Sequence, residues 1–385
     1  MKSWLILPRD PLIFRDGRPF HAVPGARARS LPFPYPSTII GAVRTRAGTN
    51  GNGKFDTDRI PELKQKRLVG PVLVMVNDQG NVDTWYFPAP ADALLVGKGY
   101  TLHRYWLRPV EVPADIRMAM PDKLTPVGPY KDVKEKPSRR TPAFWEWNAL
   151  RSWLLNPVDK DTVTASTLGV PELPVETRVH VHIDRSTGTA REGFLFQTSG
   201  RRFLHRKDSD TFITDTYGLL LWTDADFSPG PGFLGGERRV VYWQQVNMSP
   251  PNAPSESLQF TKEHKAVRLV LATPAFFEQG YLPSWLSQAV PGVKVEVVAA
   301  ALPRRPVAVS GWDMEKQQEK PTRLLVPAGT VYYLRLQGAT DAIKNFICAV
   351  WFHPISDDDQ AQRDGFGLAL LGTWNGQLAP WEVES

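Results

Sequence analysis

The chain has 385 residues, of which 42% are apolar and 13 are tryptophan, enough apolar material for a folded core spread over two or three domains. Lysine and arginine outnumber aspartate and glutamate by 46 to 40, and the net charge of +6 keeps nucleic acid among the candidate partners. The single cysteine, Cys348, excludes an internal disulfide and a zinc site built on several thiolates.

No signal sequence and no apolar run of transmembrane length is recognised, so we expect a cytoplasmic protein without membrane contact. Residues 3–7 predict a first strand, and a long arm rich in proline, glycine and arginine follows. A helix then opens at Pro36, with Ser37 or Thr38 as its cap, and ends at Gly48. Its predicted apolar face consists of Ile39, Ile40, Val43 and Ala47.

Further elements of the N-terminal half are strands at 71–77, 83–90, 217–224 and 239–246 and a helix at 143–155. Clean alternation at 179–183 and 192–197, with turn residues between, predicts a β-hairpin. The basic stretch 199–210 shows no periodicity and is interpreted as a loop.

The Pro/Ser-rich segment 248–257 predicts a linker between two domains. The N-terminal domain would span 1–247, with an insertion at about 98–176 and the hairpin and basic loop at 177–211. The C-terminal domain would span 258–385. Its predicted elements are strands at 266–274, 294–302 and 329–337, a helix at 282–290, a strand around Cys348 and a last strand after 363–372.

The stretch 232–243, GFLGGERRVVYW, places glycines directly before Arg238 and Arg239. It lacks the lysine and hydroxyl of a nucleotide-binding loop, and a strand-like run follows where a dinucleotide motif has a helix. Two interpretations stay open. The stretch is a plain connection between strands, or it cradles a phosphodiester chain, with Gly235 and Gly236 letting backbone amides approach closely.

His180, His182 and Asp184 lie on one face of the predicted hairpin and form a possible start of a metal site. Arg185 stands where a metallohydrolase motif needs another histidine, and no second histidine cluster exists. Polar residues on a solvent-facing strand explain this spacing more simply.

The arm interleaves cations with aromatic rings. Arginine offers bidentate contacts to phosphate, and aromatic rings stack on unpaired bases; the alternative is a solvated proline-rich arm. The candidate RNA-binding residues of the arm and first helix are Arg15, Arg18, His21, Arg27, Arg29, Ser37, Thr38 and Arg44. The basic loop and the glycine-rich stretch add Arg201, Arg202, Gly235, Gly236, Arg238 and Arg239.

Four segments in this order resemble RAMP proteins, the repeat-associated subunits of CRISPR effector complexes. PRDPLIFRDGRPF with YPSTIIGAVR is similar to their N-terminus, RVHVHIDRSTGTAREGFLF to their hairpin region and GFLGGERR to their glycine-rich loop. PVAVSGWDMEKQQEKPTRLLVPAGTVYYLRL resembles the subunit-three family of the type III-B (Cmr) complex. The resemblance spans most of the chain except 98–165.

The resemblance implies an α+β fold of two tandem modified ferredoxin-like (RRM-like) RAMP domains with long insertions and glycine-rich loops. It implies a structural subunit of an antiviral ribonucleoprotein, without catalytic residues, metal or cofactor, that anchors the 5′ tag of the crRNA. The implied partners are crRNA, target RNA, the large polymerase-like subunit and the RAMP backbone subunits. The C-terminal glycine loop, 363–372, has only Arg363 beside it, and whether it contacts RNA stays open.

Two other functions stay open. Related RAMP proteins are metal-independent endoribonucleases that process crRNA, and His21 is the histidine placed to act as a general acid or base. The second open function is that of a scaffold that binds only protein, with the tryptophan-rich stretch 144–153 as its partner surface.

Overall fold

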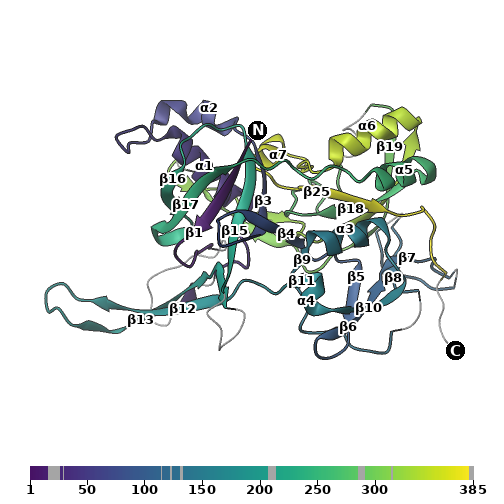
Figure 1. Cartoon of the computed structure of the whole chain (residues 1–385), viewed down its shortest axis with the longest axis horizontal. Helices are drawn as coiled ribbons and strands as arrows, with labels where there is room; N and C mark the ends of the chain where they lie inside the picture. Colours follow the sequence, from purple (N-terminus) through teal and green to yellow (C-terminus); the bar gives the residue numbers. More distant parts are fainter. Residues whose placement is uncertain are drawn as a thin grey trace. The chain divides into compact units, whose positions relative to one another are not determined.

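The computed structural model describes residues 1–15, 27, 28, 30–113, 115–121, 124–130, 133–206, 214–284, 291–313 and 315–380. The chain divides into two compact units, drawn together in Figure 1. Unit 1 comprises 1–83, 172–248 and 308–323, and unit 2 comprises 84–171, 249–307 and 324–385. Residues 84–171 therefore pack within unit 2, whereas the sequence suggested that most of them are an insertion in the N-terminal domain.

Unit 1 contains most of the N-terminal elements. Its helices and turns are α1 (Pro36–Gly48), α2 (Ile60–Lys64) and the 3-10 turns Thr57–Arg59 and Gly236–Arg238. Its strands are β1 (Lys2–Pro8), β2 (Arg27–Ala28), β3 (Leu68–Val76), β12 (Val175–Ile183), β13 (Ala190–Arg201), β14 (Leu204–Arg206), β15 (Thr214–Thr223), β16 (Gly230–Leu234), β17 (Arg239–Val246), β21 (Trp312–Asp313) and β22 (Gln318–Glu319). Three strands contain the positions where the chain passes from one unit to the other: β4 (Val82–Pro88), β20 (Val307–Val309) and β23 (Arg323–Leu325).

Five strands of unit 1 form an antiparallel sheet in the order β3-β15-β1-β17-β16. The central strand β1 is apolar from Trp4 to Pro8, and its Trp4, Leu5 and Ile6 are completely buried, as expected for a strand covered on both faces. Helix α1 contacts both β3 and β16. The guanidinium of its Arg46 donates to the Ser228 carbonyl at 2.8 Å and lies 5.9 Å from the Trp243 ring centroid. Helix α1 thus covers the sheet face that carries Trp243.

Helix α1 has the predicted bounds and apolar face, and the prediction of its cap was wrong. The residues buried along it are Pro36, Ile39, Ile40, Val43, Ala47 and Gly48. The N-cap residue is Tyr35, with Pro36 in the first helical position, so Ser37 and Thr38 already lie inside the first turn. Proline suits that position because its missing N–H would have no helical partner there.

The predicted hairpin is confirmed. Strands β12 and β13 pair antiparallel from Val175↔Arg201 to Ile183↔Ala190, and the hairpin projects from the rest of unit 1 (Figure 1). Strand β13 continues to Arg201, so the first part of the stretch predicted as a basic loop is strand.

Unit 2 contains the C-terminal elements together with those of 84–171. Its helices are α3 (Trp147–Leu155), α4 (Ala165–Leu168), α5 (Ser255–His264), α6 (Thr340–Val350) and α7 (Asp359–Arg363). Its strands are β5 (Ala93–Val96), β6 (Thr101–Trp106), β7 (Arg108–Pro109), β8 (Val127–Gly128), β9 (Phe144–Glu146), β10 (Lys160–Thr164), β11 (Gly169–Val170), β18 (Ala266–Leu271), β19 (Val293–Ala301), β24 (Val331–Gly338) and β25 (Ala369–Thr373). The predicted helix at 282–290 falls largely on residues 285–290, which lie outside the described residues.

The main sheet of unit 2 is antiparallel in the order β19-β24-β18-β25, and α6 packs against β19, β24 and β25. The run around Cys348, predicted as a strand, is part of α6. The spacing of Ile343, Phe346, Ile347 and Val350, all buried, is helical. Cys348 falls between these positions and is exposed, so the prediction of a core cysteine was wrong.

Two other features of unit 2 bear on the predicted surfaces. The C-terminal glycine loop is packed inside the unit: Asp364 and Phe366 are buried, and the Gly365 carbonyl accepts a hydrogen bond from Thr273 at 2.8 Å. Trp145 and Trp153 are completely buried, so the stretch 144–153 does not present these two rings as a partner surface. Among the described residues, no helix is both long and apolar enough to cross a membrane.

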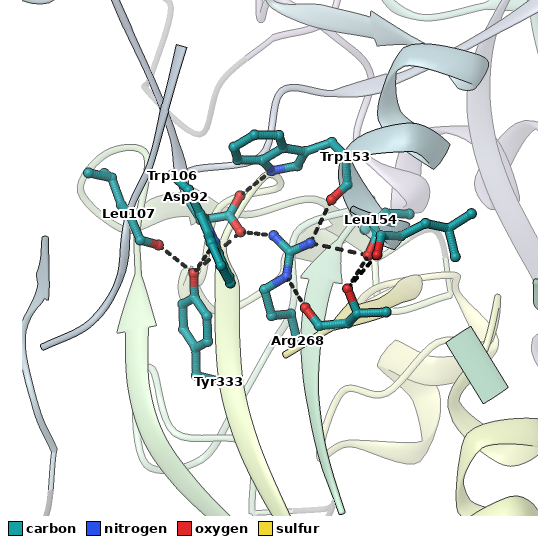
Figure 2. A network of polar contacts seen from close by, with 9 residues as sticks. Asp92, Trp106, Leu107, Trp153, Leu154, Arg268 and Tyr333 are labelled. Atoms are coloured by element: carbon teal, nitrogen blue, oxygen red, sulfur yellow. Dashed lines mark hydrogen bonds and ion pairs between the residues drawn. The ribbon is translucent and has the colours of Figure 1, made fainter. Parts of the chain in front are cut away.

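Arg268 of β18 and Asp92 form a buried ion pair (Figure 2). Arg268 and Asp92 are both completely buried and form a short, direct salt bridge. The guanidinium of Arg268 also donates to the carbonyls of Trp153 and Leu154 at 2.7 and 3.2 Å and to that of Thr373 at 2.9 Å. Two of these acceptors lie in the last turn of α3, where carbonyls lack helical partners.

The carboxylate of Asp92 has partners of its own in the same network (Figure 2). It accepts the indole N–H of Trp153 at 2.9 Å and lies 3.4 Å from the hydroxyl of Tyr333. Burial, reinforced by the negative charge of Asp92, raises the pKa of the Tyr333 phenol well above its usual value. The phenol therefore stays protonated and donates to the carbonyl of Leu107. The network joins β18, β24, β25, α3 and the loop that carries Asp92.

We expect Asp92→Ala to lower the free energy of unfolding by about 3–5 kcal/mol, because it leaves the guanidinium of Arg268 buried without a countercharge. The matched control is Asp226→Ala, which removes the partner of Lys2 in an exposed pair and should leave stability nearly unchanged. Thermal unfolding of both variants measures the difference. Equal melting temperatures would show that the buried pair does not hold unit 2 together.

Candidate nucleic-acid interface

The N-terminal arm and the glycine-rich stretch, predicted separately, lie against each other in unit 1. The backbone N–H of Gly236 donates to the carbonyl of Ile13 at 2.7 Å. The N–H of Arg9 donates to the carbonyl of Val240 at 3.0 Å, and the side chain of Asp10 accepts the N–H of Val240 at 3.0 Å. The first residues of the arm thus run beside the start of β17 and its preceding turn.

Gly235 is required by this contact. Its backbone angles, φ 78° and ψ −165°, lie in a region that essentially only glycine adopts. A Cβ at this position would lie 2.5 Å from the Ile13 carbonyl oxygen. The close approach that the glycines permit is therefore to the chain's own arm. The amide of Gly236, which we expected to meet a phosphate, donates to Ile13 instead.

The two residues after the glycines have left-handed backbones. Glu237 has φ 58° and Arg238 has φ 48°, conformations that cost non-glycine residues about 1–2 kcal/mol each. Arg239 is tied to Glu237 by an ion pair at 2.7 Å. Arg238 is exposed, and its guanidinium lies 4.5 Å from the ring centroid of Phe233. The strained turn thus places a cation over an aromatic ring.

That ring belongs to an exposed apolar face of the sheet edge. Phe233 on β16 pairs with Val240 on β17, and Tyr242 lies two residues farther along β17. Their exposed fractions are 50%, 38% and 39%. Since side chains alternate along a strand, these residues face away from Trp243 and hence from α1. We call Phe233, Arg238, Val240 and Tyr242 the platform.

Further cations lie near the platform on the arm. Arg9 is exposed, and its backbone is bonded to Val240 of the platform. Arg15 is also exposed, two residues beyond Ile13, and its backbone forms a bridge with Ser30. Exposed arginines beside an aromatic sheet face match the chemistry of a nucleic-acid chain, with phosphates for the cations and bases for the rings.

Arg201 is not an exposed loop residue, contrary to our expectation. It is buried, its guanidinium donates to the carbonyls of Leu31 and Leu173 at 3.1 and 2.9 Å, and it pairs with Glu172 at 3.1 Å. It therefore fixes the far end of the arm to the base of the hairpin. Arg202 is exposed and lies 3.8 Å from Glu176.

Arg44, like Arg201, binds backbone carbonyls of the protein. Its guanidinium donates to the carbonyls of Leu63, Lys64 and Lys66 at 2.9, 3.1 and 3.1 Å, where the chain leaves α2. Ser37 and Thr38 are half-buried in the first turn of α1. The RNA contacts assigned to these three residues stay predictions.

Several predicted residues fall where the structure gives no side chain. Arg18, His21 and Arg29 lie outside the described residues. Arg27 lies in β2, whose backbone pairs in parallel with Gln197 of β13.

His180 has partners within the hairpin. His180 contacts the Thr198 hydroxyl at 2.9 Å and stacks on Phe196 with ring centroids 5.2 Å apart. Over the described ranges, no group of three or more His, Cys, Asp and Glu residues could hold a metal ion.

The platform's Phe233 and Tyr242 were missed as candidate binding residues. The signal was the period of two along a strand, which places Val240 and Tyr242 on the face opposite Val241 and Trp243. The prediction of β17 from its β-branched and aromatic residues did not use this period. Glycine and proline in 230–232 hid the edge strand β16, because both residues are uncommon inside strands.

Comparison with protein families matches residues 4–374 to the family described as CRISPR-associated protein (Cas_Cmr3). The chain belongs to this family. It is accordingly a RAMP-like subunit of a type III-B CRISPR effector complex, as the resemblance in the sequence had indicated. A comparison with curated proteins gives no match.

Solved structures of CRISPR complexes contain chains similar to this Cas_Cmr3 member. Two come from cryo-EM structures of type III-B Cmr-beta bound to cognate target RNA. The chain from the structure that also contains AMPPnP (state 1) is 15% identical to this protein over 86% of both chains, with a TM-score of 0.45. The chain from the structure described only with target RNA is 17% identical over 86% of both chains, with a TM-score of 0.44. A chain of the Csm3-Csm4 subcomplex of a type III-A interference complex is 11% identical over 97% of this chain and 100% of its own, with a TM-score of 0.35.

The two glycines of the turn allow a matched test of its geometry. We expect Gly235→Ala to destabilise unit 1 by at least about 1–3 kcal/mol, because alanine must adopt a glycine-only conformation and its Cβ meets the Ile13 carbonyl. Gly236→Ala should be tolerated, since its Cβ would lie 3.4 Å from the nearest atom, a methyl carbon of Ile13. Melting temperatures of the two variants test this, and a larger decrease for Gly236→Ala would contradict the geometry.

Proposed function

We propose that this Cas_Cmr3 protein is a non-catalytic subunit that anchors the 5′ tag of the crRNA in the type III-B complex. The observation that carries the proposal is the junction of the arm with the glycine-rich turn. It sets Arg238 over the exposed Phe233 and brings the arm's cations to the same edge of the sheet.

The platform suits an unpaired RNA strand. Exposed aromatic rings on a sheet face stack on bases, and arginines beside them meet phosphates. The consecutive left-handed residues Glu237 and Arg238 add to this, because backbone strain of this kind concentrates at functional sites. The RNA contact is thus made by side chains of the turn, whereas its glycines and the Gly236 amide hold the arm.

The sheets support two tandem modified ferredoxin-like domains. In unit 1 the strands in chain order β1, β3, β15 and β17 lie in the spatial order β3-β15-β1-β17, and α1 follows β1. In unit 2 the strands in chain order β18, β19, β24 and β25 lie in the same spatial order, β19-β24-β18-β25, and α6 precedes the last strand. Both arrangements are antiparallel, as in a βαββαβ domain.

The remaining parts of the proposal come from the family. The partners would be the large polymerase-like subunit, the RAMP backbone subunits and, beside crRNA, target RNA. Of the predicted RNA-binding residues, those retained with a geometric reason are Arg15 and Arg238, and Arg9, Phe233 and Tyr242 join them. The RNA contact of Arg239, which pairs with Glu237, stays a prediction.

We expect Phe233→Ala to weaken binding of an RNA that carries the 5′ tag by about 1–3 kcal/mol, the range for removal of one stacked base. Arg238→Ala should weaken binding by about 1.5–3 kcal/mol and lower the slope of log affinity against log salt by about 0.7. Fluorescence anisotropy over a salt series measures both effects.

Lys54→Ala is the matched control, since it removes one exposed cation of unit 1 away from the platform. It should leave affinity and slope unchanged. If Phe233→Ala and Arg238→Ala bind tagged RNA like the wild type at unchanged melting temperature, the platform does not anchor the tag.

A subunit without catalytic residues should leave repeat RNA intact. We expect no discrete products when the pure protein is incubated with end-labelled repeat RNA. Products that disappear in His21→Ala would instead identify the protein as the processing endoribonuclease.

A further inference from the structure

A second cationic surface lies in unit 2, on the small antiparallel sheet β5-β6-β10 (Figure 1). Most of it belongs to the region 98–165, where the sequence shows no resemblance to RAMP proteins. Strands β5 and β6 are joined by Gly97, Lys98, Gly99 and Tyr100. No part of the platform or the arm contributes to it.

The tip of this hairpin presents an aromatic ring and a cation to solvent. Gly97 and Gly99 have φ of 111° and 86°, and nothing lies within 4 Å of a Cβ built on Gly99. The turn therefore uses glycine for its backbone angles. Lys98 is exposed, and Tyr100 is 82% exposed, the largest exposed fraction of any large apolar or aromatic side chain among the described residues.

The acidic residue of this sheet, Asp161, and the one just before β10, Asp159, each pair with an arginine. Asp161 pairs with Arg104, which is buried and lies 4.5 Å from the ring centroid of Trp153. Asp159 pairs with Arg108 at 3.2 Å. These carboxylates therefore do not offset the cations on the outer side.

The outer side carries cations and aromatic or hydroxyl groups. Lys160 pairs across strands with Tyr105, and its ammonium lies 5.2 Å from that ring's centroid. The hydrogen bond to Tyr105 raises the pKa of Lys160, and the negative charge of Glu135 adds to this. In the next row, His103 contacts the hydroxyl of Thr162 at 3.2 Å.

A strongly basic segment runs along the β5 edge of the same sheet. The N–H of Ser138 donates to the carbonyl of Leu95 at 2.8 Å, and Pro137 forms a bridge with Val96. These bonds hold Pro137 and Ser138, in the middle of the segment 134–140, beside the last two residues of β5. The exposed charged residues of the segment are Lys134, Glu135, Lys136, Arg139 and Arg140, four cations and one acid.

We propose that this surface, formed by Lys98, Tyr100, Lys160 and residues 134–140, binds single-stranded RNA through its phosphates and one base stacked on Tyr100. The segments 98–103, 134–140 and 160–164 contain no asparagine or glutamine, the neutral side chains best suited to reading base edges. The surface therefore contacts RNA without reading its sequence. An acidic protein is the less suitable partner, because a protein interface needs an apolar core and cations dominate here.

The first test uses the full chain and fluorescently labelled oligo-uridine without a tag, with anisotropy measured over a salt series. Tyr100→Leu should weaken binding about 5-fold or more because the base can no longer stack on a ring, and Tyr100→Phe should keep wild-type affinity. Arg139→Ala/Arg140→Ala should lower the salt slope by about 0.7 for each phosphate that these arginines neutralise in the wild type.

Lys294→Ala/Lys344→Ala is the matched control, since both lysines are exposed on other elements of unit 2. Its slope should match that of the wild type. Equal affinities of Tyr100→Leu and Tyr100→Phe, or a wild-type slope for Arg139→Ala/Arg140→Ala, would overturn the proposal. Tag binding is tested separately with Arg238→Ala. A negative result for the Tyr100 and Arg139/Arg140 variants would therefore not affect the proposal that the platform anchors the tag.

The second test identifies the strand. A benzophenone amino acid placed at position 100 is irradiated in the assembled complex, with the guide RNA and the target RNA labelled differently. Crosslinking to either RNA supports the proposal and tells which strand passes this surface. Crosslinking only to protein subunits would overturn it.

Discussion

The guanidinium of Arg268 is the group on which unit 2 depends. It is completely buried, and its cost of desolvation is offset only because the carboxylate of Asp92 and the carbonyls of Trp153, Leu154 and Thr373 surround it (Figure 2). These partners come from segments far apart in the sequence. The pair therefore explains why residues 84–171 pack with the C-terminal part of the chain.

The two units share one strand order and differ in what stands before the last strand. Unit 2 has helix α6 there, packed on its sheet, whereas unit 1 has the edge strand β16 and a strained turn. The edge strand β16 extends the sheet of unit 1 without covering either of its faces, whereas helix α6 covers one face of the sheet of unit 2. The C-terminal glycine loop is correspondingly buried, and the N-terminal one is exposed.

Local patterns in the sequence predicted local structure well. The β-branched and aromatic run at 239–246 predicted strand β17 with its observed bounds, and the spacing of Ile39, Ile40 and Val43 predicted α1. Burial of charge was not predictable in this way. Arg201 has the sequence surroundings of a loop cation, and only the distant carbonyl of Leu31 and the residues at 172–173 make it a core residue. The hydrogen bond between Ile13 and Gly236 joins residues that are far apart in the sequence, so no local pattern predicts it.

Cys348 gives the protein a practical property. It is the chain's single cysteine, and it lies exposed on α6 while its neighbours Phe346 and Ile347 anchor the helix in unit 2. A maleimide dye will therefore label the native sequence at one position, on a helix that contains no residue of either proposed RNA surface. Energy transfer from that dye to a labelled RNA end reports the position and polarity of a bound strand without any substitution in the protein.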